Sequence, residues 1–220
     1  MRLFGVVHLS LIAGTGALAA ALAAICRHRR EAAPIIANVL GWALAANEIV
    51  WWIFRYSHEG FRFPQNVPLQ LCDVAVWIAV AACLTRRPLL VELTFFGGLT
   101  AAAMAILTPD LWSPWPSYPA IYFFLSHGGI IIAAVILVYG RVVALRRGAV
   151  WRAFAFVIAY AMIVGTFDGV FHTDYMYLCE KPRSGSLLNV MGPWPIYLFS
   201  GAAVALGLFC VLWWLRPRKP

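Results

Sequence analysis

Apolar residues fill long runs along most of the chain, and short polar stretches separate these runs. A run of about 18–25 apolar residues is long enough to cross a bilayer as a helix. The pattern predicts an all-α, polytopic membrane bundle with seven transmembrane helices and no separate soluble domain. The expected spans are residues 3–25, 33–56, 67–84, 88–107, 119–140, 149–171 and 194–215, in a single domain of residues 1–220.

The composition supports a bilayer as the solvent of this chain. Hydrophobic residues make up 63% of the sequence and charged residues only 12%, more apolar surface than a soluble domain of this size can bury. The first apolar run ends in "RHRR", a stop-transfer pattern, so we interpret it as a retained span and not as a signal peptide. We therefore expect a multi-pass protein of the cell membrane.

Positive charge divides unevenly between alternate loops. One side of the predicted topology carries 12 of the 17 lysines and arginines, and by the positive-inside rule that side is cytoplasmic. The N-terminus is then outside and the C-terminus inside. The net charge of +8 reflects this topology and attraction to anionic lipid heads. It does not indicate nucleic-acid binding, because the sequence predicts no basic folded face.

Polar residues within the predicted spans gather at one depth. With a rise of about 1.5 Å per residue, nearly all of them fall in the outer half of the membrane. Five spans contribute to this level, and Glu92, near an inner end, is the exception. We expect the side chains to line a polar cavity open toward the outer surface. The residues of this layer are His8, Asn47, Glu48, Cys72, Asp73, His127, Thr166 and Asp168, with Gln70 one turn before Asp73.

Structural roles are an alternative for each of these residues. Cys72 could be a small packing residue, or it could form a disulfide with Cys179 on the same side. His127 precedes two glycines, where helices approach closely, and the carboxylates could serve fold specificity. We expect no metal and no cofactor, because the histidines lack the paired spacing of metal ligands.

Several motifs, taken in order, resemble a known family. "PLQLCD", "GGLTAAAMAILTPD", "YFFLSHGG", "TDYMYLCEKP" and "GPWPIYLF" resemble the YwaF-like bacterial integral membrane proteins over about residues 60–200. That family is in turn similar to the eukaryotic transmembrane protein 164 acyltransferase family. The chain departs from the bacterial pattern at Gln70, where histidine is frequent, and at Asp174, where asparagine is usual.

The resemblance implies lipid acyl transfer through a Cys-His pair. The cysteine of "LQLCD" gives Cys72 as nucleophile, and the histidine of "FLSHG" gives His127 as general base. The expected function is that of a phospholipid acyltransferase or acyl hydrolase that forms a thioester, with phospholipid and lysophospholipid as substrates. Candidate substrate-binding or orienting residues are Gln70, Asp73, Glu48, Asp168, Lys181 and Arg183.

Two other classes of function fit the same polar layer. The first is a transporter or small-ligand receptor with an outer cavity, although transport sites usually lie at the midplane between broken helices. The second is a non-catalytic membrane scaffold. The outer segment 172–191 is long for a connection and contains the apolar run "YMYL", so we expect it to fold over the cavity as a lid.

Overall fold

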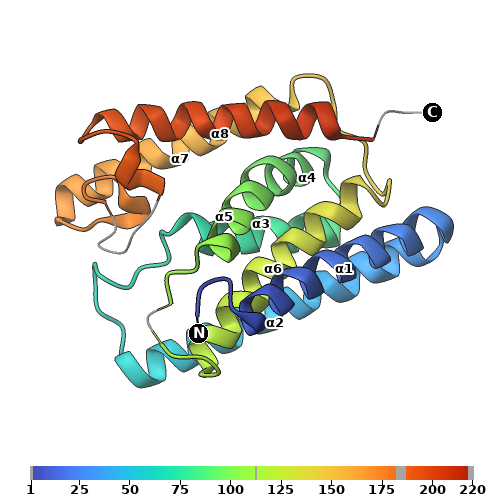
Figure 1. Cartoon of the computed structure of the whole chain (residues 1–220), viewed down its shortest axis with the longest axis horizontal. Coiled ribbons are helices and arrows are strands. Elements are labelled where there is room, and N and C mark those ends of the chain that lie inside the picture. The colour runs from blue at the N-terminus through green and yellow to red at the C-terminus, as the bar shows by residue number, and fades with distance from the viewer. Residues whose placement is uncertain (1, 112, 182–186, 218–220) are drawn as a thin grey trace.

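The chain folds into helices, and the longest connection between two of the long helices is the segment from α7 to α8 (Figure 1). The computed structural model describes residues 2–111, 113–181 and 187–217, and this part of the chain contains no strand. Its elements are α1 (Val6–His28), α2 (Ala32–Glu59), α3 (Leu71–Thr85), α4 (Pro88–Leu93), the π-helix η1 (Thr94–Gly98), α5 (Leu99–Leu107), α6 (Tyr118–Val138), α7 (Ala149–Phe171), the 3₁₀-helices η2 (Tyr175–Tyr177) and η3 (Leu187–Val190), and α8 (Ile196–Leu215).

Six helices of the described chain are long and apolar enough to cross a membrane. They are α1, α2, the continuous helix formed by α4, η1 and α5, and then α6, α7 and α8. The remaining expected span is the shorter apolar helix α3, which has 15 residues. The predicted class, an all-helical membrane protein, is therefore confirmed. The seventh crossing and the orientation remain predictions.

Helix α3 begins at Leu71, four residues later than the apolar run predicted. The residue before a proline is disfavoured in helical conformation, which is consistent with a bend and not a helix at Val67, ahead of Pro68. Gln70 is extended (φ −64°, ψ 147°) and forms the N-cap, with Asp73 as its capping-box partner. The segment 60–70 is consequently a non-helical connection, and Cys72 lies in the first helical turn and not deeper.

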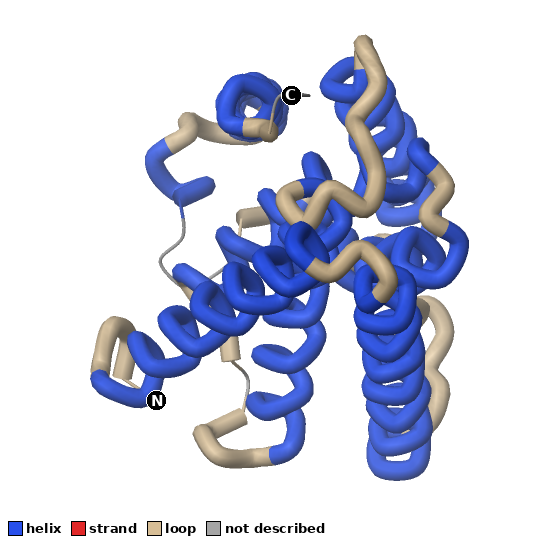
Figure 2. Tube along the Cα trace, turned by 90° about the vertical axis from the view of Figure 1, so that its right-hand side faces the viewer, coloured by secondary structure: helices blue, strands red, loops and turns tan. Residues whose placement is uncertain are grey.

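Helix α6 is the central helix of the bundle. It packs against α1 and α2 on one side and against α3, η1 and α5 on the other. Helices α7 and α8 run side by side as an outer pair along one edge, in contact with α4, α5 and η1 (Figures 1 and 2). Helices α2, α3 and α6, which carry Glu48, Cys72 and His127, therefore pack against one another in one bundle.

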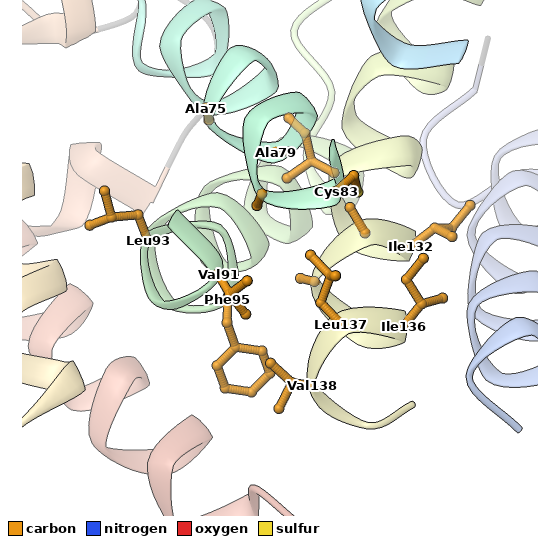
Figure 3. Packing of buried hydrophobic residues seen from close by; sticks show 14 of the residues in the cluster. Ala75, Ala79, Cys83, Val91, Leu93, Phe95, Ile132, Ile136, Leu137 and Val138 are labelled. Carbon is orange, nitrogen blue, oxygen red and sulfur yellow. The ribbon is translucent and has the colours of Figure 1, made fainter. Parts of the chain in front are cut away.

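Small residues bring the central helices close together. A Cβ atom on Gly129 of α6 would lie 2.4 Å from Cδ2 of Leu44 in α2, so any larger residue there would force the leucine side chain to move. Farther along α6, its aliphatic side chains face alanines and Cys83 of α3 (Figure 3). Close approach of this kind is the usual basis of helix association in membranes, where apolar burial gives little driving force.

The expected span 88–107 contains a π-helical segment from Thr94 to Gly98. Such segments are rare, and they are frequent near functional sites. A Cβ on Gly98 would lie 3.1 Å from Cγ2 of Ile130, so glycine permits the close contact with α6. The glycine pair of the motif "GGLTAAAMA" thus serves close packing.

Glu92 lies at the opposite end of the bundle from Cys72 and pairs with two arginines. Its carboxylate is buried, and it accepts from Nε and Nη2 of both Arg146 and Arg152 at 2.8–3.0 Å. The backbone N–H of Arg146 also donates to it at 3.2 Å. These bidentate contacts attach the α6–α7 turn and the start of α7 to α4.

Replacing Glu92 by glutamine should destabilise the bundle, because two guanidinium groups would lose their shared carboxylate. We expect the melting temperature of the purified protein in detergent to fall by about 5 °C. The matched control is Glu31→Gln, which alters an exposed acid that forms no ion pair with another described residue. Equal melting temperatures for the two variants would contradict a stabilising role of the ion pairs.

Candidate functional site

Cys72 occupies the second position of helix α3, directly after the capped end. The backbone N–H of Gln70 donates to Oδ2 of Asp73 at 3.1 Å, and this bond fixes the first turn. Cys72 is half-buried, and all five cysteines, including Cys179, are free thiols. The helix therefore presents a thiol at its N-terminus.

The first turn of α3 has donors to spare. Within the described chain the backbone N–H groups of Leu71 and Cys72 donate to no carbonyl, and that of Cys72 lies in range of its own thiol, whereas Asp73 and Val74 both donate to the carbonyl of Gln70. Unpaired N–H groups at a helix N-terminus carry partial positive charge. They suit a negatively charged atom, such as a thiolate or the oxyanion of an acyl intermediate.

Glu48 of α2 belongs to the same region. It is fully buried and accepts from Nε1 of Trp52 and from the hydroxyl of Tyr122, each at 2.7 Å. The carboxylates of Glu48 and Asp73 both lie within electrostatic reach of Cys72. The structure thus brings together three of the predicted site residues, from α2 and α3.

His127 is buried in α6 and is oriented by its own helix. Nδ1 lies 2.8 Å from the carbonyl oxygen of Phe123, one turn earlier, and the two rings are 4.2 Å apart. A carbonyl only accepts, so Nδ1 carries the hydrogen and Nε2 of the neutral ring has a lone pair. No hydrogen bond of the described chain joins His127 to Cys72 or to a carboxylate; Phe123, and not an acid, orients the ring.

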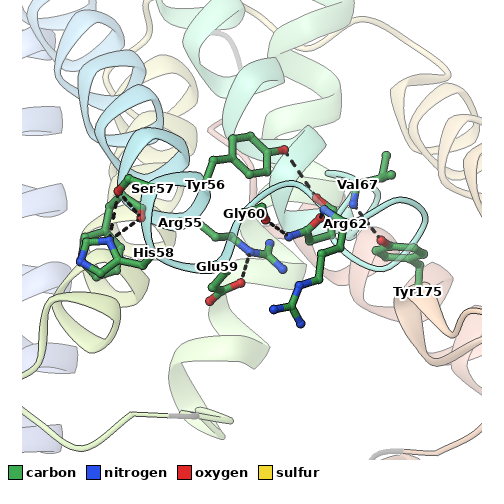
Figure 4. Close-up of polar contacts among 11 residues, drawn as sticks. Arg55, Tyr56, Ser57, His58, Glu59, Gly60, Arg62, Val67 and Tyr175 are labelled. Atoms are coloured by element: carbon green, nitrogen blue, oxygen red, sulfur yellow. Dashed lines mark hydrogen bonds and ion pairs between the residues drawn. The ribbon is translucent and has the colours of Figure 1, made fainter.

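The non-helical connection between α2 and α3 is held by side chains (Figure 4). Asn66 accepts from the N–H of Arg62 at 2.6 Å and donates to the carbonyl of Gly60 at 2.8 Å. The hydroxyl of Tyr160 donates to the carbonyl of Leu69 at 3.0 Å. The segment before Cys72 is therefore a turn held by side-chain hydrogen bonds, and Tyr160 of α7 bonds to its end.

Residues 172–195, which join α7 to α8, are called the connector here. Its first part is hydrogen-bonded to this same turn. Asp168 is buried and accepts from the N–H of Tyr175 and the hydroxyl of Thr173. The Tyr175 hydroxyl donates to the carbonyl of Pro64 at 2.7 Å and accepts from the N–H of Val67 at 3.0 Å. Asp168 thus acts through Tyr175, which links residues more than 100 positions apart.

Gln70 completes the link between the connector and α3. Its side-chain oxygen accepts from the N–H of Met176 at 2.9 Å. Met176 and Tyr177 both have left-handed φ values, 58° and 56°, which non-glycine residues rarely adopt. Burial is the largest cause that raises the pKa of the Tyr177 phenol, and the negative charge of the nearby Asp110 is the next. The connector therefore turns sharply beside the start of α3.

The two predicted cations of the connector have different outcomes. Nζ of Lys181 lies 5.3 Å from the centroid of the Tyr197 ring. Arg183 lies outside the described residues. Their predicted contact with a lipid phosphate stays a prediction.

Three residues of the connector region could offer ligands to a metal ion. Atoms of Asp168, Asp174 and Cys179 lie within 4.8 Å of one another. Backbone N–H groups of Tyr175, Cys179 and Glu180 already bond to the two carboxylates. Burial and then the surrounding acids raise the pKa of the Cys179 thiol, which favours its neutral form. The folding of the connector accounts for this cluster without an ion.

Aromatic side chains that the sequence analysis did not predict form many of the hydrogen bonds that hold these segments together. Trp52 follows Glu48 at the i, i+4 spacing of one helix face, a signal that was available. The hydrogen-bond acceptors of Tyr122, Tyr160 and Tyr175 lie on other elements, so no local sequence pattern predicts these contacts.

Some polar atoms in the bundle are buried without a partner among the described residues. They are Nδ2 of Asn47 and the hydroxyls of Thr100, Ser117 and Tyr118. Asn47 is adjacent to Glu48 in sequence, and Tyr118 is within electrostatic reach of that carboxylate. Buried polar atoms are normally satisfied, so these atoms are available to a polar ligand or water.

The apolar helices and the polar groups between them define a helical multi-pass membrane protein. The model of the TMEM164 family matches residues 3–213, so the chain belongs to the TMEM164 family. The expected resemblance to the transmembrane protein 164 family is thereby confirmed, and the YwaF-like label is compatible with it. Neither the comparison with curated proteins nor that with solved structures gave a match.

Replacing Tyr175 by phenylalanine should loosen both segments that its hydroxyl joins. The carbonyl of Pro64 and the N–H of Val67 would each lose a partner, at a cost of about 1–3 kcal/mol. We expect faster hydrogen exchange in residues 61–69 and 173–178. Tyr177→Phe is the control, because its bond to Asp110 is long, 3.4 Å, and exposed. Unchanged exchange in Tyr175→Phe would refute the link.

Proposed function

We propose that the chain is a membrane-embedded acyltransferase or acyl hydrolase that acts on phospholipid acyl esters. The observation that carries this proposal is a free thiol, Cys72, beside unpaired N–H groups at the start of a helix. A nucleophile and donors for an oxyanion are the two components that acyl transfer requires. Membership of the TMEM164 family is compatible with this chemistry.

In the proposed first step, Nε2 of His127 takes the thiol proton of Cys72. The thiolate attacks the ester carbonyl carbon, and the N–H groups of Leu71 and Cys72 stabilise the oxyanion. The ester C–O bond breaks, the lysophospholipid leaves with the proton from His127, and a thioester remains. In the second step a hydroxyl of lysophospholipid or water gives its proton to His127 and attacks the thioester. The C–S bond breaks, and the thiol of Cys72 is restored.

The pair must meet directly or through one water for this transfer. We expect the Cys72 sulfur and a ring nitrogen of His127 to approach within about 5 Å, since catalytic contacts are often looser without substrate. The bond from Nδ1 to Phe123 supports the role of His127, because it leaves Nε2 as the basic nitrogen. Glu48 and Asp73 set the charge around the thiol.

The remaining candidates act at the rim of the site. Gln70 and Asp168 hold the connector in place, which supports a role in positioning and not in direct binding of substrate. Lys181, together with Arg183, is proposed to meet the lipid phosphate. Phospholipid and lysophospholipid are the proposed partners.

We also propose seven crossings of the cell membrane, with the N-terminus outside. The 15 residues of α3 rise about 22 Å, less than the bilayer core of about 30 Å. If Arg86 and Arg87 mark its inner boundary, Cys72 lies several ångströms below the outer one. That depth suits an ester group, which lies just beneath the lipid heads.

Substitution of Cys72 tests the chemistry. Cys72→Ala should lower acyl release from phospholipid at least about a thousandfold, and His127→Gln should lower it about a hundredfold or more. Incubation with phospholipid should add one acyl mass to the peptide of Cys72, and hydroxylamine should remove it. Cys179→Ser, at an exposed thiol, is the control. Full activity of Cys72→Ala would refute the proposal.

A fusion after Pro220 tests the orientation. The uneven distribution of 17 basic residues places this end in the cytoplasm, so a fused green fluorescent protein should fluoresce and a fused alkaline phosphatase should stay inactive. Active phosphatase at this end would reverse the topology.

A further inference from the structure

A groove lies at the end of the bundle opposite Cys72, between the start of α7 and the end of α8. These two segments lie side by side where the outer helix pair terminates (Figure 1). The groove has a volume of about 180 Å³, and nearly all of its lining is apolar. It is lined by Gly148, Ala149, Val150, Trp151, Cys210 and Trp213.

Positive charge lies beside this groove, since Nη1 of Arg152 would be 3.3 Å from a Cβ atom on Gly148 of its lining. Glu92 neutralises only one of its two arginine partners, so the cluster of Glu92, Arg146 and Arg152 keeps a net charge of +1. Arg147, directly before the lining, is exposed and adds a second positive charge. Residues 139–155 and 206–217 contain no acidic side chain that would offset them.

The start of α7 adds donors at the same place. In the described chain no acceptor contacts the N–H groups of Val150 and Trp151, whereas those of Ala149 and Arg152 are bonded. Helix α7 has 23 residues, and both unpaired N–H groups belong to residues that line the groove. An anion at this position would meet the positive end of the helix dipole, with Arg147 directly before the helix.

Aromatic residues mark this end as a membrane boundary. Trp151 is 64% exposed and Trp214 is 70% exposed, while Trp213 forms one wall of the groove. Tryptophan favours the level of the lipid heads, where one side of the ring is apolar and the other is wet. The groove therefore offers an apolar wall and a cationic rim at the depth of a phosphate.

We propose that this groove binds an anionic phospholipid. The phosphate lies against Arg147 and the N–H groups of Val150 and Trp151, and one acyl chain lies between Trp151, Cys210 and Trp213. A zwitterionic lipid fits less well, because its cationic head would face the arginines. A soluble phosphate lacks the apolar part that the walls would cover. This site is separate from Cys72 and does not depend on the proposed acyl transfer.

Protection of Cys210 from alkylation tests the site on the intact protein. The protein in neutral detergent is treated with N-ethylmaleimide, and modification of each cysteine is followed by peptide mass spectrometry. Phosphatidylglycerol should slow the reaction of exposed Cys210 several-fold. Phosphatidylcholine and glycerol 3-phosphate should not slow it. Free N-acetylcysteine in the same detergent solution is the control, and its rate of alkylation should stay constant.

Substitutions then test the rim. Arg147→Gln should raise the phosphatidylglycerol concentration for half-protection about fivefold, the effect of one basic residue beside an anionic lipid. Arg30→Gln is the matched control, since it removes an exposed arginine from the α1–α2 turn, away from the groove. Equal protection by phosphatidylcholine, protection by glycerol 3-phosphate alone, no protection at Cys210, or equal shifts in both variants would each overturn the proposal.

Discussion

A backbone that leaves helical geometry between apolar helices must still pair its N–H and C=O groups. The end of the bundle that holds Cys72 depends on this requirement. The turn before α3 meets it with side chains, chiefly Asn66, Tyr160 and Tyr175. Because those partners come from three different elements, the turn, α7 and the connector are fixed together. The first turn of α3 takes its position from that assembly.

A second set of contacts holds the other end of the outer pair. Glu92 attaches the start of α7 to α4 through two arginines, and Asp168 organises the end of the same helix. Helix α7 has little buried surface between these two points. Polar anchors at its two ends therefore do what an apolar face cannot do in lipid, where the surrounding chains are as apolar as the helix.

The helices could be predicted because a bilayer demands long apolar runs, and every run in this sequence became a helix. The start of α3 was misplaced because apolar residues continue through Val67, Pro68 and Leu69, although proline and the pair Gln70 and Asp73 signalled the cap. The polar residues within the apolar runs could be identified from the sequence, and their common depth in the membrane stays a prediction. Their division into separate bonded groups could not be predicted, since a tyrosine at position 175 carries no sign that it will meet Pro64.

Asp73 combines two tasks in one carboxylate. It closes the first turn of α3 by accepting from Gln70, and its carboxyl group lies within electrostatic reach of Cys72. A substitution that changed the electrostatic environment of the thiol would also fray the helix that carries it. The surroundings of the thiol and the local stability of α3 are thus tied to one side chain, so that a change at Asp73 alters both at once.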